Sequence, residues 1–141
     1  MKKKYVRAGR FALYDHHTIP IFDTITHKFS KRTVVADDVF SLYEWADHMT
    51  SVSNNGAASV VWREAMLMRA FGEKYTNMTE EQATIFFKET PRDSLARMAN
   101  RIVNNPLRDL GIEHEEWRLG SMFTRGATAI VPPMGGSIGT P

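Results

Sequence analysis

The sequence predicts an α+β fold: a small, mainly helical body of about four helices, with a short N-terminal β element and extended arms at both ends. Three observations support this. Apolar residues alternate loosely with polar ones in the first 35 residues, recur at helical spacing from residue 36 to 119, and give way after residue 120 to a glycine- and proline-rich segment. We therefore expect one domain with three segments: a basic N-terminal arm and β element (1–35), a helical body (36–119) and an extended C-terminal arm (120–141).

Two strands are expected before residue 36, over residues 4–14 and 19–26. Both stretches place apolar side chains at alternate positions, and the isoleucines of the second share one face. Pro20 has no N–H to donate, so the second strand should lie at an edge or be irregular. Residues 30–32 (Ser-Lys-Arg) are expected to turn the chain into a third short run, residues 33–35 (Thr-Val-Val).

The first two helices of the body follow from apolar stripes and polar caps. Asp37 is a suitable N-cap for the first helix, whose stripe reaches Met49. The polar residues 50–56 end this helix and offer a cap for the second. The second helix should run to Phe71 and stop at Gly72, because glycine favours the backbone that follows a helix.

The residues that begin and end the third and fourth helices are clearer. Thr79 and Gln82 form the capping-box pattern that opens the third helix. Pro91 ends it and starts the fourth, where apolar residues recur at a period of 3.6 from Leu95 onward. Residues 104–106 (Asn-Asn-Pro) should close the fourth helix.

Charge is unevenly distributed along the chain. The first 33 residues hold eight cations against two acids, whereas the remainder holds ten cations against fourteen acids. The cations of the basic arm are Lys2, Lys3, Lys4, Arg7 and Arg10. This excess indicates a segment that meets nucleic acid or the acidic face of another copy, or a basic terminus exposed to solvent.

Residues 15–17 (Asp-His-His) end an apolar run and precede Pro20. This stretch resembles one motif of the DHH phosphoesterase family, in which a strand ends in Asp-His-His and helps to hold a manganese pair beside a phosphodiester. The family's other metal-binding aspartates lie on earlier strands, whereas the 14 residues before Asp15 contain no acid. Adjacent strand residues also point to opposite faces, so His16 and His17 should not meet one ion. We predict that the triplet is not catalytic and holds no metal.

A smaller metal site is left open by the sequence. Asp15 or His17 could meet Asp23 and His27 if a hairpin folds them together. The alternative is a set of polar side chains in a loop, or contacts to a partner.

Other features that bear on catalysis point away from an enzyme. Glu44 and His48 lie one helical turn apart, which favours a surface ion pair. There is no cysteine, and no glycine-rich phosphate-binding motif or nucleophile motif is present. We therefore predict a non-enzymatic protein with no catalytic residue, no metal and no cofactor.

The C-terminal arm has an unusual composition. Residues 131–141 contain three of the six prolines and three of the nine glycines, without any charge. Such a segment cannot bury its own backbone, so we expect it to dock on a neighbouring subunit. The apolar anchors for that contact would be Met122, Phe123, Ile130, Val131, Met134 and Ile138.

These features favour a structural subunit of a large assembly, whose partners are other protein subunits, including copies of itself. By analogy of architecture we expect a virus or phage component (capsid-associated, connector or tail protein), located in the virion and assembled in the host cytoplasm. The alternative is a small nucleic-acid-binding or regulatory protein that uses the basic arm and the helix bearing Arg97 and Arg101. No apolar run reaches the ~20 residues of a membrane span, so no membrane partner is expected.

Overall fold

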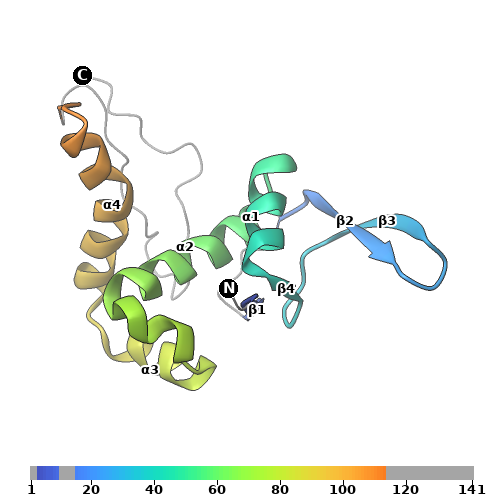
Figure 1. The fold of residues 1–141 in the computed structure, drawn as a ribbon, viewed down its shortest axis with the longest axis horizontal. Coiled ribbons are helices and arrows are strands. Elements are labelled where there is room, and N and C mark those ends of the chain that lie inside the picture. The colour runs from blue at the N-terminus through green and yellow to red at the C-terminus, as the bar shows by residue number, and fades with distance from the viewer. Residues whose placement is uncertain (1–2, 10–14, 114–141) are drawn as a thin grey trace. The chain divides into compact units, whose positions relative to one another are not determined.

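The computed structural model describes residues 3–9 and 15–113 and confirms the predicted α+β class (Figure 1). Contacts divide the chain into two compact units, Met1–Val61 and Trp62–Pro141, with the boundary inside the second helix. The predicted segment boundaries at residues 35 and 119 were defined by composition and stay a prediction. Among the described residues, no helix combines the length and apolar character that a membrane crossing requires.

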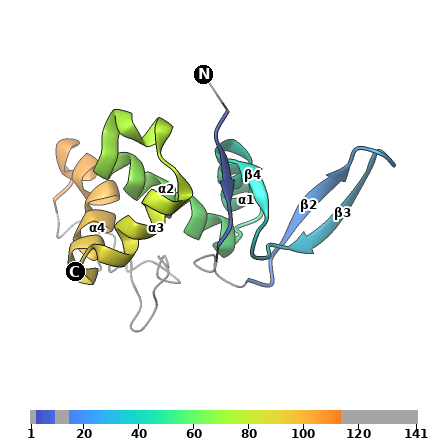
Figure 2. The same cartoon turned by 90° about the horizontal axis from the view of Figure 1, so that it is seen from below.

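The described residues of the first unit form two small antiparallel β structures. Strand β1 (Tyr5–Arg7) pairs with β4 (Val39–Ser41), with Val6 opposite Phe40. Strands β2 (Thr18–Asp23) and β3 (Lys28–Thr33) form a separate two-stranded ribbon, the β2–β3 ribbon, which extends away from α1 and β4 (Figures 1 and 2).

The ribbon turns at residues 24–27, and the turn predicted at residues 30–32 is wrong. Asp23 Oδ1 accepts hydrogen bonds from the N–H groups of Ile25 (2.8 Å) and Thr26 (3.2 Å), and His27 has a positive φ of 54°. An aspartate that bonds its own backbone in this way makes a tight turn. Residues 30–32 belong to β3 and are polar because that strand is exposed, so the short strand predicted at residues 33–35 is reduced to Thr33.

The N-cap predicted at Asp37 is also wrong. Helix α1 (Leu42–Ser51) begins after Ser41, whose hydroxyl accepts a hydrogen bond from the Glu44 N–H at 3.2 Å. The Glu44 carboxylate in turn accepts one from the Ser41 N–H at 2.8 Å, which completes a capping box. The helix starts late because β4, immediately before it, pairs with β1.

The core of the first unit surrounds Trp45 of α1. This side chain is fully buried, and its indole N–H donates to the Val6 carbonyl oxygen at 2.9 Å, which joins α1 to β1. The Phe40 ring meets the indole edge to face, with centroids 4.9 Å apart. The buried members of this cluster are Val6, Ala8, Ile19, Val34, Trp45, Ala57 and Val60.

The described part of the second unit, residues 62–113, is helical. It contains the rest of α2 (Asn55–Phe71), the 3-10 turn η1 (Gly72–Asn77), α3 (Glu80–Glu89) and α4 (Arg92–Asp109). The capping box of Thr79 and Gln82 is confirmed, and Gly72 has the positive φ of 55° that ends α2. The predicted end of the fourth helix at residues 104–106 is wrong, because α4 continues through Pro106. Proline lacks an N–H and its ring crowds the preceding turn, but Pro106 lies in the last turn of α4, where the N–H of the C-cap residue Leu110 donates to the Pro106 oxygen at 3.1 Å.

Within residues 62–113, the second unit combines two apolar clusters with one buried polar network. Met66 of α2 packs on Leu95 and Ala99 of α4, while Leu67 packs on Tyr75 and Ala83. Beside them, the buried Arg63 donates to Glu64 at 3.0 Å and to Glu80 at 2.6 Å. The Tyr75 hydroxyl donates to the other oxygen of Glu64, and burial of Tyr75 together with this bond raises the pKa of the phenol strongly. The buried charges of this network are therefore matched by partners within the unit.

We predict that two identical substitutions in the second unit will have very different effects on stability. Leu95 is 7% exposed and Leu110 is 77% exposed. Leu95→Ala should lower the free energy of unfolding by about 2–5 kcal/mol, because it leaves a cavity between α2 and α4. Leu110→Ala should change it by less than about 0.5 kcal/mol. Urea denaturation followed by circular dichroism measures both, and equal effects would contradict the core assignment.

Candidate functional site

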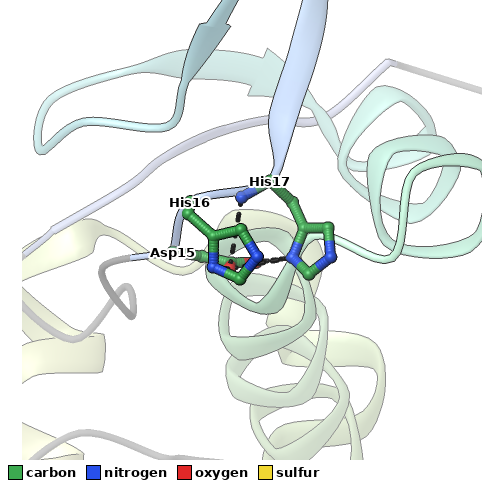
Figure 3. Close-up of side chains that lie close together, drawn as sticks. All are labelled: Asp15, His16 and His17. Carbon is green, nitrogen blue, oxygen red and sulfur yellow. Dashed lines mark hydrogen bonds and ion pairs between the residues drawn. The ribbon is translucent and has the colours of Figure 1, made fainter.

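The Asp15-His16-His17 triplet lies in a bend before β2, and the prediction that its residues alternate across a strand is wrong. Because the backbone bends here, all three side chains gather on one side (Figure 3). One ligand atom from each residue lies within 4.8 Å of the others. The two imidazole rings stack with centroids 4.4 Å apart.

The Asp15 carboxylate connects this bend to the start of α2. It is buried, and its Oδ2 accepts a hydrogen bond from the Asn55 N–H at 2.7 Å. His17 Nδ1 lies 2.9 and 3.0 Å from the two carboxylate oxygens. From the other side, Asn54 donates its side-chain N–H to the His17 carbonyl at 2.8 Å while its Oδ1 accepts from Ala57 N–H at 2.8 Å. Asp15 and Asn54 together satisfy donors that would be unpaired at the helix N-terminus.

The environment of Asp15 favours its charged form. Burial raises the pKa of the carboxyl, but the hydrogen bonds from Asn55 and His17, with the attraction of the His17 ring, lower it by more. The pKa therefore lies below the usual 3.8, and Asp15 is ionised at neutral pH. An ionised carboxylate at a helix N-terminus also interacts favourably with the helix dipole.

The triplet lacks the ligands that a pair of divalent ions needs. It contains one carboxylate, whose Oδ1 accepts a hydrogen bond from the His17 N–H and whose Oδ2 accepts one from the Asn55 N–H. The His16 side chain is exposed and its Nδ1 lies 3.5 Å from Asp15 Oδ1. Asp23 and His27, which the sequence left as further candidates, lie at the turn of the β2–β3 ribbon and are not in the described group of three. The prediction that the triplet is neither catalytic nor a metal centre stays a prediction, and the geometry favours a folding role for Asp15.

The surface ion pair expected between Glu44 and His48 is not formed among the described residues. Glu44 caps α1, as described above, and His48 is buried with its ring edge to face against Phe40 at 5.1 Å. Burial lowers the pKa of His48, although Asp47 and other nearby carboxylates oppose this shift. His48 is therefore a core residue and not half of an exposed ion pair.

The other predicted site residues are only partly described. In the basic arm, Lys3 lies over the Tyr5 ring at 5.6 Å and Arg7 pairs with Asp37 at 3.5 Å. Lys4 precedes β1, whereas Lys2 and Arg10 lie outside the described residues, as does the whole predicted C-terminal arm. The anchors predicted for that arm therefore stay a prediction; they are Met122, Phe123, Ile130, Val131, Met134 and Ile138.

The outer end of the β2–β3 ribbon carries an exposed apolar cluster that the sequence reasoning missed. Phe22 and Phe29 face each other across the strands with ring centroids 5.0 Å apart, and Ile25 lies in the turn. Their exposed fractions are 47%, 73% and 89% respectively, and none belongs to a hydrophobic cluster of the described residues. We call these three residues the apolar tip. The sequence feature that could have indicated this cluster is the short turn Asp-Thr-Ile-Thr-His, which lies between two phenylalanines.

The second unit carries a groove that the sequence did not predict either. It has a volume of about 760 Å³ and lies between the end of α2, η1 and α3. Its apolar lining consists of Phe71, Met78, Ile85, Phe86 and Pro91, and we call it the α2–α3 groove. Ile85 is half exposed at its mouth.

We predict that Asp15→Asn will destabilise the protein in a pH-dependent way. The variant keeps the shape of the side chain but loses the charge, so the free energy of unfolding at pH 7 should fall by about 1.5–3 kcal/mol. A carboxylate whose pKa is lowered on folding stabilises above its unfolded pKa of about 4, and this contribution is lost as the pH falls through the folded pKa. The difference from the wild type should therefore shrink in acid. Urea titrations across this range test it, with the exposed Asp37→Asn as control, and a pH-independent difference would contradict it.

We also predict that the triplet does not hydrolyse phosphodiesters. With manganese, magnesium or zinc, purified protein should cleave a chromogenic phosphodiester no faster than buffer does, because Asp15 alone cannot supply the oxygen ligands of a metal pair. Metal-dependent hydrolysis that disappears in Asp15→Ala would overturn this prediction.

Comparison with known proteins identifies no relative of this chain. No family model matches this sequence, and neither a curated protein nor a solved structure shows significant similarity to it. What the chain does is therefore inferred from its own residues.

Proposed function

We propose that the protein is a non-enzymatic structural subunit that assembles by docking the apolar tip of one copy into the α2–α3 groove of another. The assembly that we propose is a virus or phage particle, put together in the host cytoplasm. The C-terminal arm would supply a further contact to neighbouring subunits.

The apolar tip is the observation that carries this proposal. A two-stranded ribbon is at best marginally stable in water unless it packs against something. The base of the ribbon packs in the core of the first unit through the buried Ile19, but Phe22, Ile25 and Phe29 at the other end remain in solvent. Clustered exposed apolar side chains of this kind are typical of interaction sites. Burying each is worth about 1.5–3 kcal/mol, so a partner surface would stabilise the ribbon substantially.

The α2–α3 groove suits the tip in size and in chemistry. Its volume of about 760 Å³ can take several apolar side chains, and its lining is largely apolar. The charges around the two surfaces also differ in sign. Arg32 pairs with Asp38, and Glu80 pairs with Arg63. The remaining charges are two lysines against one acid on the ribbon, and two acids against one lysine on α3. Opposite charge steers two surfaces together and selects the partner.

Docking of a tip into a groove joins two different surfaces of the same protein. Such a heterologous contact leaves one free tip and one free groove at the ends of every dimer, so that further copies can add. Repeated addition gives rings or filaments, which are the forms that structural subunits of a particle adopt. A non-catalytic role needs no site beyond these two surfaces.

Variants of the two surfaces test this proposal. The double variant Ile25→Ser, Phe29→Ser removes the two most exposed residues of the apolar tip, and Ile85→Ser weakens the groove. Each alone should reduce self-association in size-exclusion chromatography with light scattering, because each lacks one half of every contact. Tyr43→Ser is the matched control, because Tyr43 is 81% exposed on α1 and belongs to neither surface.

Mixing the two variants gives the decisive result. A tip variant still has an intact groove and a groove variant still has an intact tip, so the mixture should recover dimers but nothing larger. Circular dichroism checks that each variant is folded. A wild-type protein that stays monomeric at its highest soluble concentration would overturn the proposal, as would tip variants that assemble like Tyr43→Ser.

A further inference from the structure

Three arginines gather around a hollow of about 510 Å³ on the second unit. We call it the arginine hollow, and its lining is Arg69, Ser94, Arg97, Met98, Arg101 and Asn105. Arg97 and Arg101 were expected to lie one turn apart on one helix. Arg69 comes from α2, nearly thirty residues earlier in the chain, and joins them only in the folded protein.

Helix packing explains why these three side chains meet. Met66 of α2 packs in a cluster with Leu95 and Ala99 of α4. Arg69 follows Met66 by three residues, so it lies on the same side of α2 as this contact. Arg97 and Arg101 flank the partly buried Met98 of α4, which belongs to the same cluster. The core contact thus holds the three cations at the edge of one hollow.

The three arginines are not neutralised within the described residues. No carboxylate pairs with any of them there, and no carboxylate lines the hollow. Arg97 makes one hydrogen bond, to the uncharged Ser94 hydroxyl at 3.2 Å. Arg32, by contrast, forms a bidentate ion pair with Asp38, with hydrogen bonds of 2.7 and 2.8 Å. Like charges around one hollow repel, so an anion that enters it is stabilised by all three.

We infer that the arginine hollow binds phosphate groups of a nucleic-acid backbone. Arginine suits phosphate because its planar guanidinium donates two parallel hydrogen bonds. The three side chains are exposed and come from two helices, so they can contact successive phosphates without reading sequence. Ser94 and Asn105 add uncharged donors, which also commonly bond phosphate oxygens. The basic pI of about 9.0 favours the same class of ligand.

The salt dependence of binding tests the inference. A fluorescent oligothymidine strand is titrated with the full chain over a range of salt concentrations. Three phosphate contacts on a single strand contribute about 2 to the slope of log affinity against log salt, or roughly 0.7 each. The triple variant Arg69→Gln, Arg97→Gln, Arg101→Gln should flatten the slope by that amount, and Arg69→Gln alone by about a third of it.

Arg92→Gln is the matched control, because Arg92 is an exposed arginine on α4 that does not line the hollow. The basic N-terminal arm is intact in every variant, so its contribution cancels in the comparison. Thermal unfolding confirms that the variants are folded. Absence of oligonucleotide binding, or equal slopes for the triple variant and Arg92→Gln, would overturn the inference. Binding of inorganic phosphate without binding of the oligonucleotide would also overturn it, because the ligand would then be a small free anion.

Discussion

A single buried carboxylate organises the first unit around the start of α2. Asp15 comes from a bend in the chain and bonds the Asn55 N–H, where a helix has unpaired donors and a dipole that favours negative charge. Asn54, which precedes α2, donates its side-chain N–H to the carbonyl oxygen of His17. Since β2 begins at Thr18, directly after this contact, Asp15 also holds the chain close to the point where the β2–β3 ribbon begins.

This role accounts for a triplet that otherwise resembles part of a phosphoesterase motif. A carboxylate beside two histidines is the chemistry of many metal sites, yet here both oxygens of Asp15 are used to cap a helix and to orient His17. The same three residue types can therefore serve folding or catalysis. The difference lies in whether other acids converge on them, and in the described group none does.

The apolar tip and the arginine hollow both differ from the rest of the described protein, because their side chains lack the partners that similar side chains have elsewhere. Most large apolar side chains of the helices enter clusters, whereas those of the apolar tip remain in solvent. Arg63, with its two glutamates, is matched inside the second unit, whereas the cations of the arginine hollow have no acid beside them among the described residues. Apolar groups in water, and like charges that are held close together, both carry a free-energy cost that a binding partner can remove. These surfaces are therefore where we place protein and nucleic-acid contacts.

The sequence by itself determined the features that depend on neighbouring residues. The stripe from Leu95 onward and the capping box of Thr79 and Gln82 act over a few positions, so the helices could be predicted from them. Only the tertiary structure decided what depends on distant residues. Pairing of β4 with β1 moved the start of α1 from Asp37 to Ser41, and packing of α2 on α4 brought Arg69 to Arg97. The polar residues 30–32 likewise form part of β3 and not a turn. Because the ribbon packs on the core only at its base, the exposed part of β3 does not need apolar side chains at alternate positions.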